Sequence, residues 1–382
     1  MSVACEFALI GNPTSAQAAA VRDAVDLMVR GFGMEIGREV AWSVQPEAFD
    51  SGKPCASAVA FFGSSSTTLG LAEQLIRDAV PIIPVVTSAA LVSKELPEAL
   101  RHLNALEYDS DGAQRVATAL LECAGLLPKQ RRVFISYRRN EARAAAFQLF
   151  HGLVDRRFDV FLDTHGVAYG DDFQEVLWHR LCDSDVLIML ETPSYFASRW
   201  TAAEFGRALS KGIAVLQVVW PTVTPSETTS TSSRVSLGES DVATSDGLLG
   251  ADALQLVLAQ LEVVRSKSIA VRRVSMVNHL ADEVRRIGGQ FLGVGNGGGA
   301  YLVLPRGNRV VAYPSVGVPT ALSLQEATEF DPDCESVVAY DHLGISPKWM
   351  RHLNWLGSRI ASPKWLQVTQ AGWTLSDWSG PT

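Results

Sequence analysis

Three apolar runs in the middle of the chain have the pattern of buried β-strands. They are VFISY, DVFL and DVLIML, and each is followed by a polar loop and then by a helical pattern. Such strand, loop and helix units predict an open parallel α/β sheet. Ligands bind at the carboxyl ends of the strands in these sheets. We therefore expect a site among residues 137–140, 163–172 and 192–204.

Residues 1–127 predict a separate, Rossmann-like α/β domain of ordinary size. Its expected strands are 4–10, 56–62 and 81–86, and its expected helices are 16–30, 67–79 and 112–126. The last helix ends in LLPKQ, which marks a boundary just before the central domain. Nothing in this segment indicates what the domain does.

A weak internal repeat relates the first domain to the central one. Residues 57–86 parallel residues 184–219 in their order of strand, serine-containing loop, acidic helix and strand. Two interpretations are open, because any two βαβ units share this order, whereas a duplicated copy could have lost its chemistry. Glu73, for example, follows Leu69 rather than a tryptophan. The loop 63–66 could cradle a phosphate or only cap a helix, and it lacks the lysine of a P-loop.

The composition changes abruptly after Pro221. Residues 222–248 are rich in Ser and Thr and poor in aliphatic side chains, which predicts a flexible insertion. Apolar residues at helical spacing then predict a helix over 251–264. We assign this helix to the central domain, which would span residues 131–265.

Residues 268–382 predict a third α/β domain. The expected helices are 269–287 and 347–360, and the expected strands are 290–294, 301–304, 309–313, 335–342 and 364–369. The sequence GNGGG at 295–299 predicts a hairpin turn, because no helix follows it as a phosphate-binding loop would require. The role of this domain is left open by the sequence.

Two features of the third domain could carry chemistry, but each also has a structural explanation. Asp341 and His342 could transfer protons or simply end a strand, and no nucleophile motif accompanies them. Five tryptophans could build a core or a protein interface, or stack on bases. They are Trp349, Trp355, Trp365, Trp373 and Trp378. We favour the structural explanation for both features.

Composition narrows the classes of partner. The 382 residues are 47% hydrophobic, which allows two or three cores, and the formal net charge is −8. This charge gives no reason to expect a dedicated nucleic-acid partner or an anionic membrane. The five cysteines are scattered, which predicts reduced thiols and no metal site. Without a signal peptide or an apolar run of roughly 20 residues, we expect a cytoplasmic protein.

The most specific chemical feature is SRWTAAEF, at residues 198–205. Trp200 and Glu204 lie four residues apart on a predicted helix, so their side chains point the same way. One carboxylate suits cleavage of the ribose–nicotinamide bond of NAD⁺, because nicotinamide leaves as a neutral molecule and needs no general acid. The carboxylate can stabilise the oxocarbenium-like charge of the transition state. The spacing alone also fits a purely structural pair of side chains, which is the more common case.

Several motifs together resemble a TIR (Toll/interleukin-1 receptor) domain. They are FISYRRNE at 134–141, DVFLDTHGVAYGDDF at 159–173, and SDVLIMLETPSYFASRW with TAAEF at 184–205. The resemblance covers residues 131–221, extends toward 265, and involves roughly a third of the chain. It implies a flavodoxin-like fold and, for bacterial, plant and some animal members, NAD⁺ hydrolase activity. The first domain is then either a degenerate TIR-like copy or an unrelated Rossmann-like domain.

The resemblance also implies roles for individual residues. The catalytic glutamate of these enzymes maps onto Glu204, and the preceding tryptophan maps onto Trp200. Residues that would contact the dinucleotide or shape its pocket are Tyr137, Arg138, Arg139, Asp163, Gly170 and Asp171. The segment 163–172 corresponds to a loop that borders the pocket and mediates TIR–TIR assembly.

Two hypotheses about function follow. In the first, the protein is a bacterial antiphage effector whose assembled TIR domains consume NAD⁺ after an infection-derived trigger. NAD⁺ is then the substrate, with no other cofactor and no metal, and the product is either ADP-ribose or a cyclised form. In the alternative, the protein is a non-catalytic adaptor that binds other TIR domains through residues 163–172.

Overall fold

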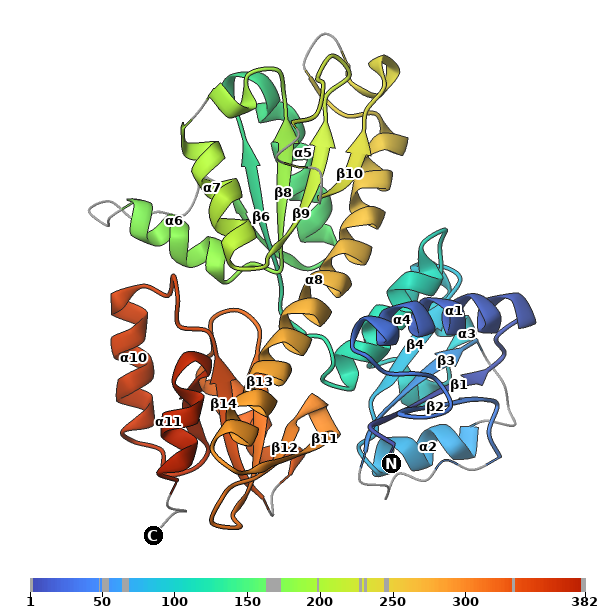
Figure 1. Cartoon of the computed structure of the whole chain (residues 1–382). Coiled ribbons are helices and arrows are strands. Elements are labelled where there is room, and N and C mark those ends of the chain that lie inside the picture. The colour runs from blue at the N-terminus through green and yellow to red at the C-terminus, as the bar shows by residue number, and fades with distance from the viewer. Residues whose placement is uncertain are drawn as a thin grey trace.

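The structure is a computed structural model that describes residues 3–47, 49, 55–63, 69–162, 173–197, 199–226, 229, 232–243, 247–331 and 334–378. These residues form three five-stranded sheets, each flanked by helices and each in a successive part of the chain (Figure 1). The mixed α/β fold class predicted from the sequence is confirmed. The segment 163–172 lies outside the described residues.

The first sheet is parallel throughout, with strand order β2-β1-β3-β4-β5. Its strands are β1 (Cys5–Gly11), β2 (Val40–Val44), β3 (Ala56–Phe62), β4 (Ile82–Val86) and β5 (Leu106–Glu107). Its helices are α1 (Ser15–Gly31), α2 (Leu69–Arg77), α3 (Val92–Glu95) and α4 (Gly112–Cys123). The sequence pattern did not reveal β2 and β5, because both are short strands with partly exposed residues.

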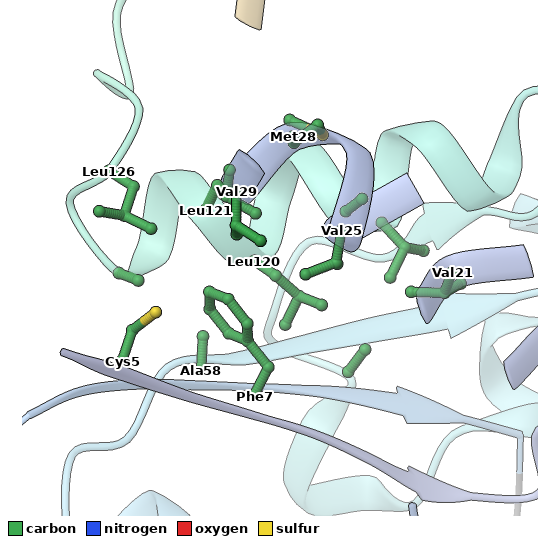
Figure 2. Packing of buried hydrophobic residues seen from close by; sticks show 14 of the residues in the cluster. Cys5, Phe7, Val21, Val25, Met28, Val29, Ala58, Leu120, Leu121 and Leu126 are labelled. Carbon is green, nitrogen blue, oxygen red and sulfur yellow. The ribbon is translucent and has the colours of Figure 1, made fainter. Parts of the chain in front are cut away.

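One core of this domain lies between the sheet and helices α1 and α4. Figure 2 shows Phe7 of β1 beneath Val25 and Val29 of α1 and Leu120 of α4. These four side chains are all fully buried. Helix α1 begins where expected because Thr14 caps it, accepting a hydrogen bond from the helix backbone and so satisfying one of its free donors.

The central sheet is also parallel and has the order β10-β9-β8-β6-β7. Its strands are β6 (Arg131–Tyr137), β7 (Phe158–Leu162), β8 (Val186–Glu191), β9 (Ala214–Val219) and β10 (Ser233–Ser236). Its helices are α5 (Arg139–Asp155), α6 (Phe173–Cys182) and α7 (Arg199–Ser210). In chain order this is the 2-1-3-4-5 arrangement of flavodoxin-like folds, as expected. The first sheet has the same arrangement.

The strand β10 corrects the interpretation of residues 222–248 as a flexible insertion. Residues 233–236 pair in parallel with β9, and Val235 and Leu237 are buried. A Ser/Thr-rich segment with few apolar side chains can still form a strand when an existing sheet edge supplies its hydrogen bonds. The composition argument was wrong here because it considered the segment in isolation.

The third sheet is mixed, with order β11-β12-β13-β14-β15. Its strands are β11 (Gln290–Val294), β12 (Ala300–Val303), β13 (Arg309–Ser315), β14 (Glu335–Tyr340) and β15 (Lys364–Gln367). Its helices are α9 (Ala321–Phe330), α10 (Pro347–Gly357) and α11 (Ala371–Ser376). The antiparallel pair β11 and β12 confirms the hairpin predicted at 295–299. The sequence analysis missed α9.

Helix α8 (Ala251–Arg286) runs past all three domains (Figure 1). It supplies side chains to the core of each. Val257 and Leu261 are in the central core, Ile269 in the first core, and Leu280 and Val284 in the third. At 1.5 Å per residue the helix is roughly 54 Å long. The predicted break between two helices was wrong, because the residues RSKS at 265–268 continue the helix and contain neither Gly nor Pro.

A buried guanidinium group joins α8 to the first two domains. The Nε of Arg265 donates to Asp185 at 2.7 Å, and Nη1 donates to Glu122 at 2.8 Å. Its Nη2 donates to the carbonyls of Pro128 and Gln130 at 2.7 and 3.2 Å. Arg265 is 0% exposed, and this set of contacts meets the requirement that a buried charge be paired and hydrogen-bonded.

Polar contacts also join the central and third domains. Asp183, which follows α6, accepts hydrogen bonds from Arg132 at 2.7 Å and from the backbone N–H of Val318 at 2.8 Å. Lys211 forms an ion pair with Asp341 at 2.5 Å. Asp341, one of the two residues considered for chemistry, therefore contacts the central domain.

The described helices include none that is both long enough and apolar enough to cross a membrane. The five cysteines, all of them described, form no disulfide.

We predict that Arg265→Ala lowers the free energy of unfolding by about 3–5 kcal/mol, because the buried carboxylate of Asp185 loses its charged partner. Glu122 keeps its contact with Arg131. Arg265→Lys should restore little of this loss, since an ammonium cannot reproduce the planar fork of contacts. Chemical denaturation followed by far-UV circular dichroism measures both. The control is Arg285→Ala on the same helix. Arg285 forms an exposed ion pair with Asp282, and such a pair contributes at most about 1 kcal/mol to the free energy of unfolding. Equal losses for Arg265→Ala and the control would contradict this account.

A second prediction concerns His179 of α6, whose Nδ1 accepts a 3.4 Å hydrogen bond from the backbone N–H of Ser346 in the third domain. Burial, followed by the charges of Arg180 and Arg132, lowers the pKa of His179 to about 4. The unfolded chain has a histidine pKa of about 6.5. Between these values the unfolded state binds more protons, so the stability contribution is complete above pH 6.5 and is lost as the pH falls toward 4.

We therefore expect the unfolding free energy of the wild type to depend more steeply on pH than that of His179→Gln in this window. The difference in slope should reach at most about 1.4 kcal/mol per pH unit, the value for one proton. Asp183 is present in both proteins, so its own titration largely cancels. Identical slopes from pH 7 to pH 4 would show that His179 is not held neutral.

Candidate functional site

The polar and ionisable side chains that could bind a ligand or catalyse a reaction gather at the carboxyl edge of the central sheet. Helix α7 follows β8 through a short turn and the 3-10 helix Tyr195–Ala197. It ends at Ser210, and Gly212 two residues later has a φ of +66°, the left-handed conformation that glycine tolerates. Glu204 lies in the second turn of α7 and is 2% exposed.

A chain of hydrogen bonds connects the sheet to Glu204. The Oγ of Ser136 donates a hydrogen bond to Oε2 of Glu204 at 2.5 Å. The Oγ of Ser136 also lies 2.7 Å from the hydroxyl oxygen of Tyr195. Since Ser136 has one proton and gives it to the carboxylate, Tyr195 must be the donor to Ser136. Burial, followed by the charge of Glu204, raises the pKa of Tyr195 well above its usual value, so its proton stays in place.

The alternation of side chains along the strands explains this geometry. In β6, Phe134 and Ser136 face helices α6 and α7, whereas Ile135 and Tyr137 face α5 and α8. Thr201 fixes the start of α7 by donating a 2.6 Å hydrogen bond to the carbonyl of Tyr195. The carboxylate is therefore placed by three neighbouring elements rather than by a flexible loop.

A second buried carboxylate lies on the same face of the sheet. Glu191, the last residue of β8, is 2% exposed and accepts hydrogen bonds from the side-chain amide of Gln217 and from the backbone N–H of Ser226. Gln217 in turn accepts a 3.0 Å hydrogen bond from Nε of Arg234. These hydrogen bonds connect β8, β9 and β10. They form a polar layer in the interior of the domain, which is normally apolar.

The loops after β6 and β8 are joined across the point where the strand order reverses. Arg138 donates to the carbonyl of Ser194 at 2.8 Å and lies 3.4 Å from Glu141, which accepts from the backbone N–H of Ser194. Burial raises the pKa of Glu141, but hydrogen bonds from residues 192–194 and the charge of Arg138 outweigh it, so the net pKa is lowered. Ligands of flavodoxin-like folds bind at this reversal point.

The predicted site residues differ in where the structure places them. Glu204, Arg138 and Arg139 lie at the carboxyl edge, with Arg138 as the residue that precedes α5 and Arg139 as its first residue. Tyr137 is 3% exposed and packs in the core between the sheet and α5, on the face away from Glu204.

The remaining predicted residues fall where the structure is not described. Asp163, Gly170 and Asp171 lie outside the described residues, and so does the side chain of Trp200 in the first turn of α7. Their proposed contacts with substrate stay predictions.

Three residues of the site were missed from the sequence, namely Ser136, Tyr195 and Glu191. Side chains alternate along the strand FISY, so Ser136 and Tyr137 point to opposite faces of the sheet. This alternation could have shown that only one of the two faces the helix that follows β8. The sequence does not say which face that helix covers, so the choice between the two required the structure. Glu191 resembled the polar end of an ordinary strand.

This arrangement holds a buried carboxylate in a fixed position near the sheet edge, where it can stabilise a cation once the carboxylate becomes accessible. The described ranges contain no group of three or more His, Cys, Asp and Glu side chains that could hold a metal ion. The nearby guanidinium of Arg138 is two-thirds buried and already bonded to Ser194, so its main role in this state is to position the two loops.

A comparison with protein-family models agrees with the fold of the central domain. The family model described as the TIR domain matches residues 133–244. A similar solved structure is that of the TIR domains in the activated Roq1 resistosome directly recognizing the pathogen effector XopQ. The identity is 16% over 38% of this chain and 84% of that chain, with a TM-score of 0.25.

Another similar structure is the C-terminal domain of glucosamine-fructose-6-phosphate aminotransferase from Francisella tularensis. It is 10% identical over 72% of this chain and 85% of that chain, with a TM-score of 0.21. Similarities this low carry no argument about function. No curated protein matches the chain. The family match and the 2-1-3-4-5 sheet together show that residues 133–244 are a TIR domain.

Proposed function

We propose that the TIR domain cleaves the ribose–nicotinamide bond of NAD⁺ and that the protein is an effector of bacterial antiphage immunity. The observation that carries the proposal is the placement of Glu204. Its carboxylate lies at the ligand-binding edge of the sheet, fixed by Ser136, which Tyr195 supports. A carboxylate held in this way has the fixed position that stabilisation of transition-state charge requires.

The chemistry of NAD⁺ fits a site with one fixed carboxylate. The nicotinamide ring is cationic in the substrate and leaves as a neutral molecule, so the bond breaks without a general acid. Positive charge moves onto the ribose as the bond lengthens, and a fixed anion nearby stabilises it. Water, or another nucleophile in the site, then attacks the ribose carbon, and which one does so determines whether ADP-ribose or a cyclised product forms.

The burial of Glu204 supports a requirement for assembly. At 2% exposure the carboxylate is closed to substrate in the single chain, so catalysis requires neighbouring segments to rearrange. The strands of the central sheet point away from the other two domains, which leaves the carboxyl edge accessible to another molecule (Figure 1). We therefore expect contacts between TIR domains at this edge to complete the pocket after an infection-derived trigger.

Replacement of Glu204 tests the proposed catalytic role. With the full chain concentrated until light scattering shows oligomers, wild type should release nicotinamide from NAD⁺. Glu204→Ala and Glu204→Gln should lower the rate by roughly 100-fold or more, the usual cost of removing a group that stabilises transition-state charge. Chromatography of nicotinamide measures the rate. The control is Glu239→Ala, which removes an exposed carboxylate from the same domain and should leave the rate unchanged.

Failure of the assembled wild type to release nicotinamide would exclude NAD⁺ cleavage under these conditions. Equal rates for wild type and Glu204→Gln would instead exclude Glu204 as the catalytic anion.

Ser136 offers a separate test, because it positions the carboxylate without contacting substrate. Loss of one hydrogen bond to a charged group costs about 1.5–3 kcal/mol, so Ser136→Ala should lower kcat by roughly 10- to 100-fold. KM should change little if only positioning is lost. Tyr195→Phe acts through the same hydroxyl, so the double variant should be no slower than Ser136→Ala. Additive losses, or an increase in rate, would contradict a positioning chain.

The alternative function is that of an adaptor that acts only through TIR–TIR contacts. The burial of Glu204 favours it, since a closed carboxylate can also be a structural acid. In an infection assay, full protection by cells carrying Glu204→Gln would support the adaptor. Loss of protection with normal oligomer formation would support the enzyme.

A further inference from the structure

A basic groove lies between the TIR domain and the third domain, away from Glu204. It encloses about 1190 Å³. Its described lining comes from residues 129–132 at the start of β6, residues 157–159 at the start of β7, helix α6 with Asp183, the loop at 318–320, and residues 346–352 of α10 and its cap. Seven of its lining residues are Lys or Arg and three are Asp or Glu. Such an excess is unexpected in a chain with a formal net charge of −8.

Several of these cations are not used to hold the domains together. Lys129 and Arg157 on the TIR side, and Lys348 and Arg351 on α10, are exposed and form no ion pair within the described part of the chain. By contrast, Arg131 and Arg132 are bound to carboxylates. Unpaired cations on two facing walls favour an anion between them, because like charges repel until a counter-charge binds.

Helix α10 interleaves these cations with aromatic rings. The ring centroids of Trp349 and His352 lie 5.2 Å apart, and those of His352 and Trp355 lie 6.1 Å apart at 22°. Trp349 is partly buried and packs on the third domain, whereas Trp355 is 55% exposed and covers no core. Lys348 and Arg351 sit on the same helix, one residue before Trp349 and His352.

An exposed aromatic row beside unpaired cations is the arrangement that binds a flexible phosphodiester chain. Cations contact the phosphates, and bases stack on rings without sequence preference. In a duplex the faces of the bases are already stacked on one another, so they could not stack on the aromatic rings of α10. A free phosphate would need only one or two of the cations. The amino end of α10, capped by Ser346, adds a partial positive charge at the groove.

We infer that this groove and the exposed face of α10 bind single-stranded nucleic acid. Phosphates lie between the cations of the two walls, and bases stack on His352 and Trp355. The net charge of the whole chain gave no reason to expect a nucleic-acid partner, because it averages over the molecule and does not show this local excess of positive charge. Because the lining comes from two domains, a bound strand contacts both of them. The inference does not depend on NAD⁺ cleavage, and its test involves no catalytic residue.

The test measures binding of fluorescein-labelled ten-nucleotide strands, oligo(U) and oligo(dT), to the full chain by fluorescence anisotropy over a range of salt concentrations. Lys348→Ala/Arg351→Ala should weaken binding and reduce the slope of log K against log salt by about 1.4, the value for two phosphate contacts of a single strand. Trp355→Ala should weaken binding by at least about five-fold, from the lower end of stacking energies. The two probes distinguish RNA from DNA, and binding of either supports the inference.

Matched variants elsewhere in the third domain control for charge and for aromatic loss. Arg306→Ala/Arg309→Ala removes two exposed cations at the other end of the same sheet, and Trp373→Ala removes a tryptophan that is 82% exposed. Both should bind as wild type does. The inference is overturned if neither strand binds, if the control variants lose as much affinity, or if inorganic polyphosphate competes equally and Trp355→Ala has no effect.

Discussion

The arrangement of the three domains depends on the burial of one guanidinium group. Arg265 lies on α8 with no exposed surface, and its partners Asp185 and Glu122 come from the TIR domain and the first domain. A buried charge is tolerated only when its donors are satisfied. The first domain therefore cannot separate from the TIR domain without exposing or orphaning these charges, and α8, which continues into the third core, carries the constraint across the molecule.

This constraint also determines which edge of the TIR sheet is accessible. Arg131 and Asp185 lie at the amino ends of the strands and bond to Glu122 of the first domain and Arg265 of α8. Arg132 lies at the same edge and bonds to Asp183, which also accepts a hydrogen bond from Val318 of the third domain. The carboxyl edge, with Glu204, points away (Figure 1). A signal received by a flanking domain can therefore reach Glu204 only through the strands and helices of the TIR sheet, or by bringing a second molecule to the free edge.

The sequence predicted features that depend on local pattern and missed those that depend on tertiary context. The buried strands, the hairpin at 295–299 and the helix that carries Glu204 follow from apolar runs and turn residues. The edge strands β2, β5 and β10 were missed because a strand supported by a neighbour needs little hydrophobicity of its own. Ser136 was passed over in favour of Tyr137, because the sequence does not show which face α7 covers.

The first domain shows that the fold by itself does not make the site. Its sheet has the same strand order as the TIR sheet, yet the α2 side of β1 carries Ala8 and Ile10, and Glu73 on α2 is exposed. Without a hydroxyl group on the strand, a buried carboxylate there would lose its hydrogen-bond donor, and burial would cost more than exposure. The placement of Glu204 thus depends on the hydroxyl group of Ser136 beneath it, which β6 has and the corresponding strand β1 lacks.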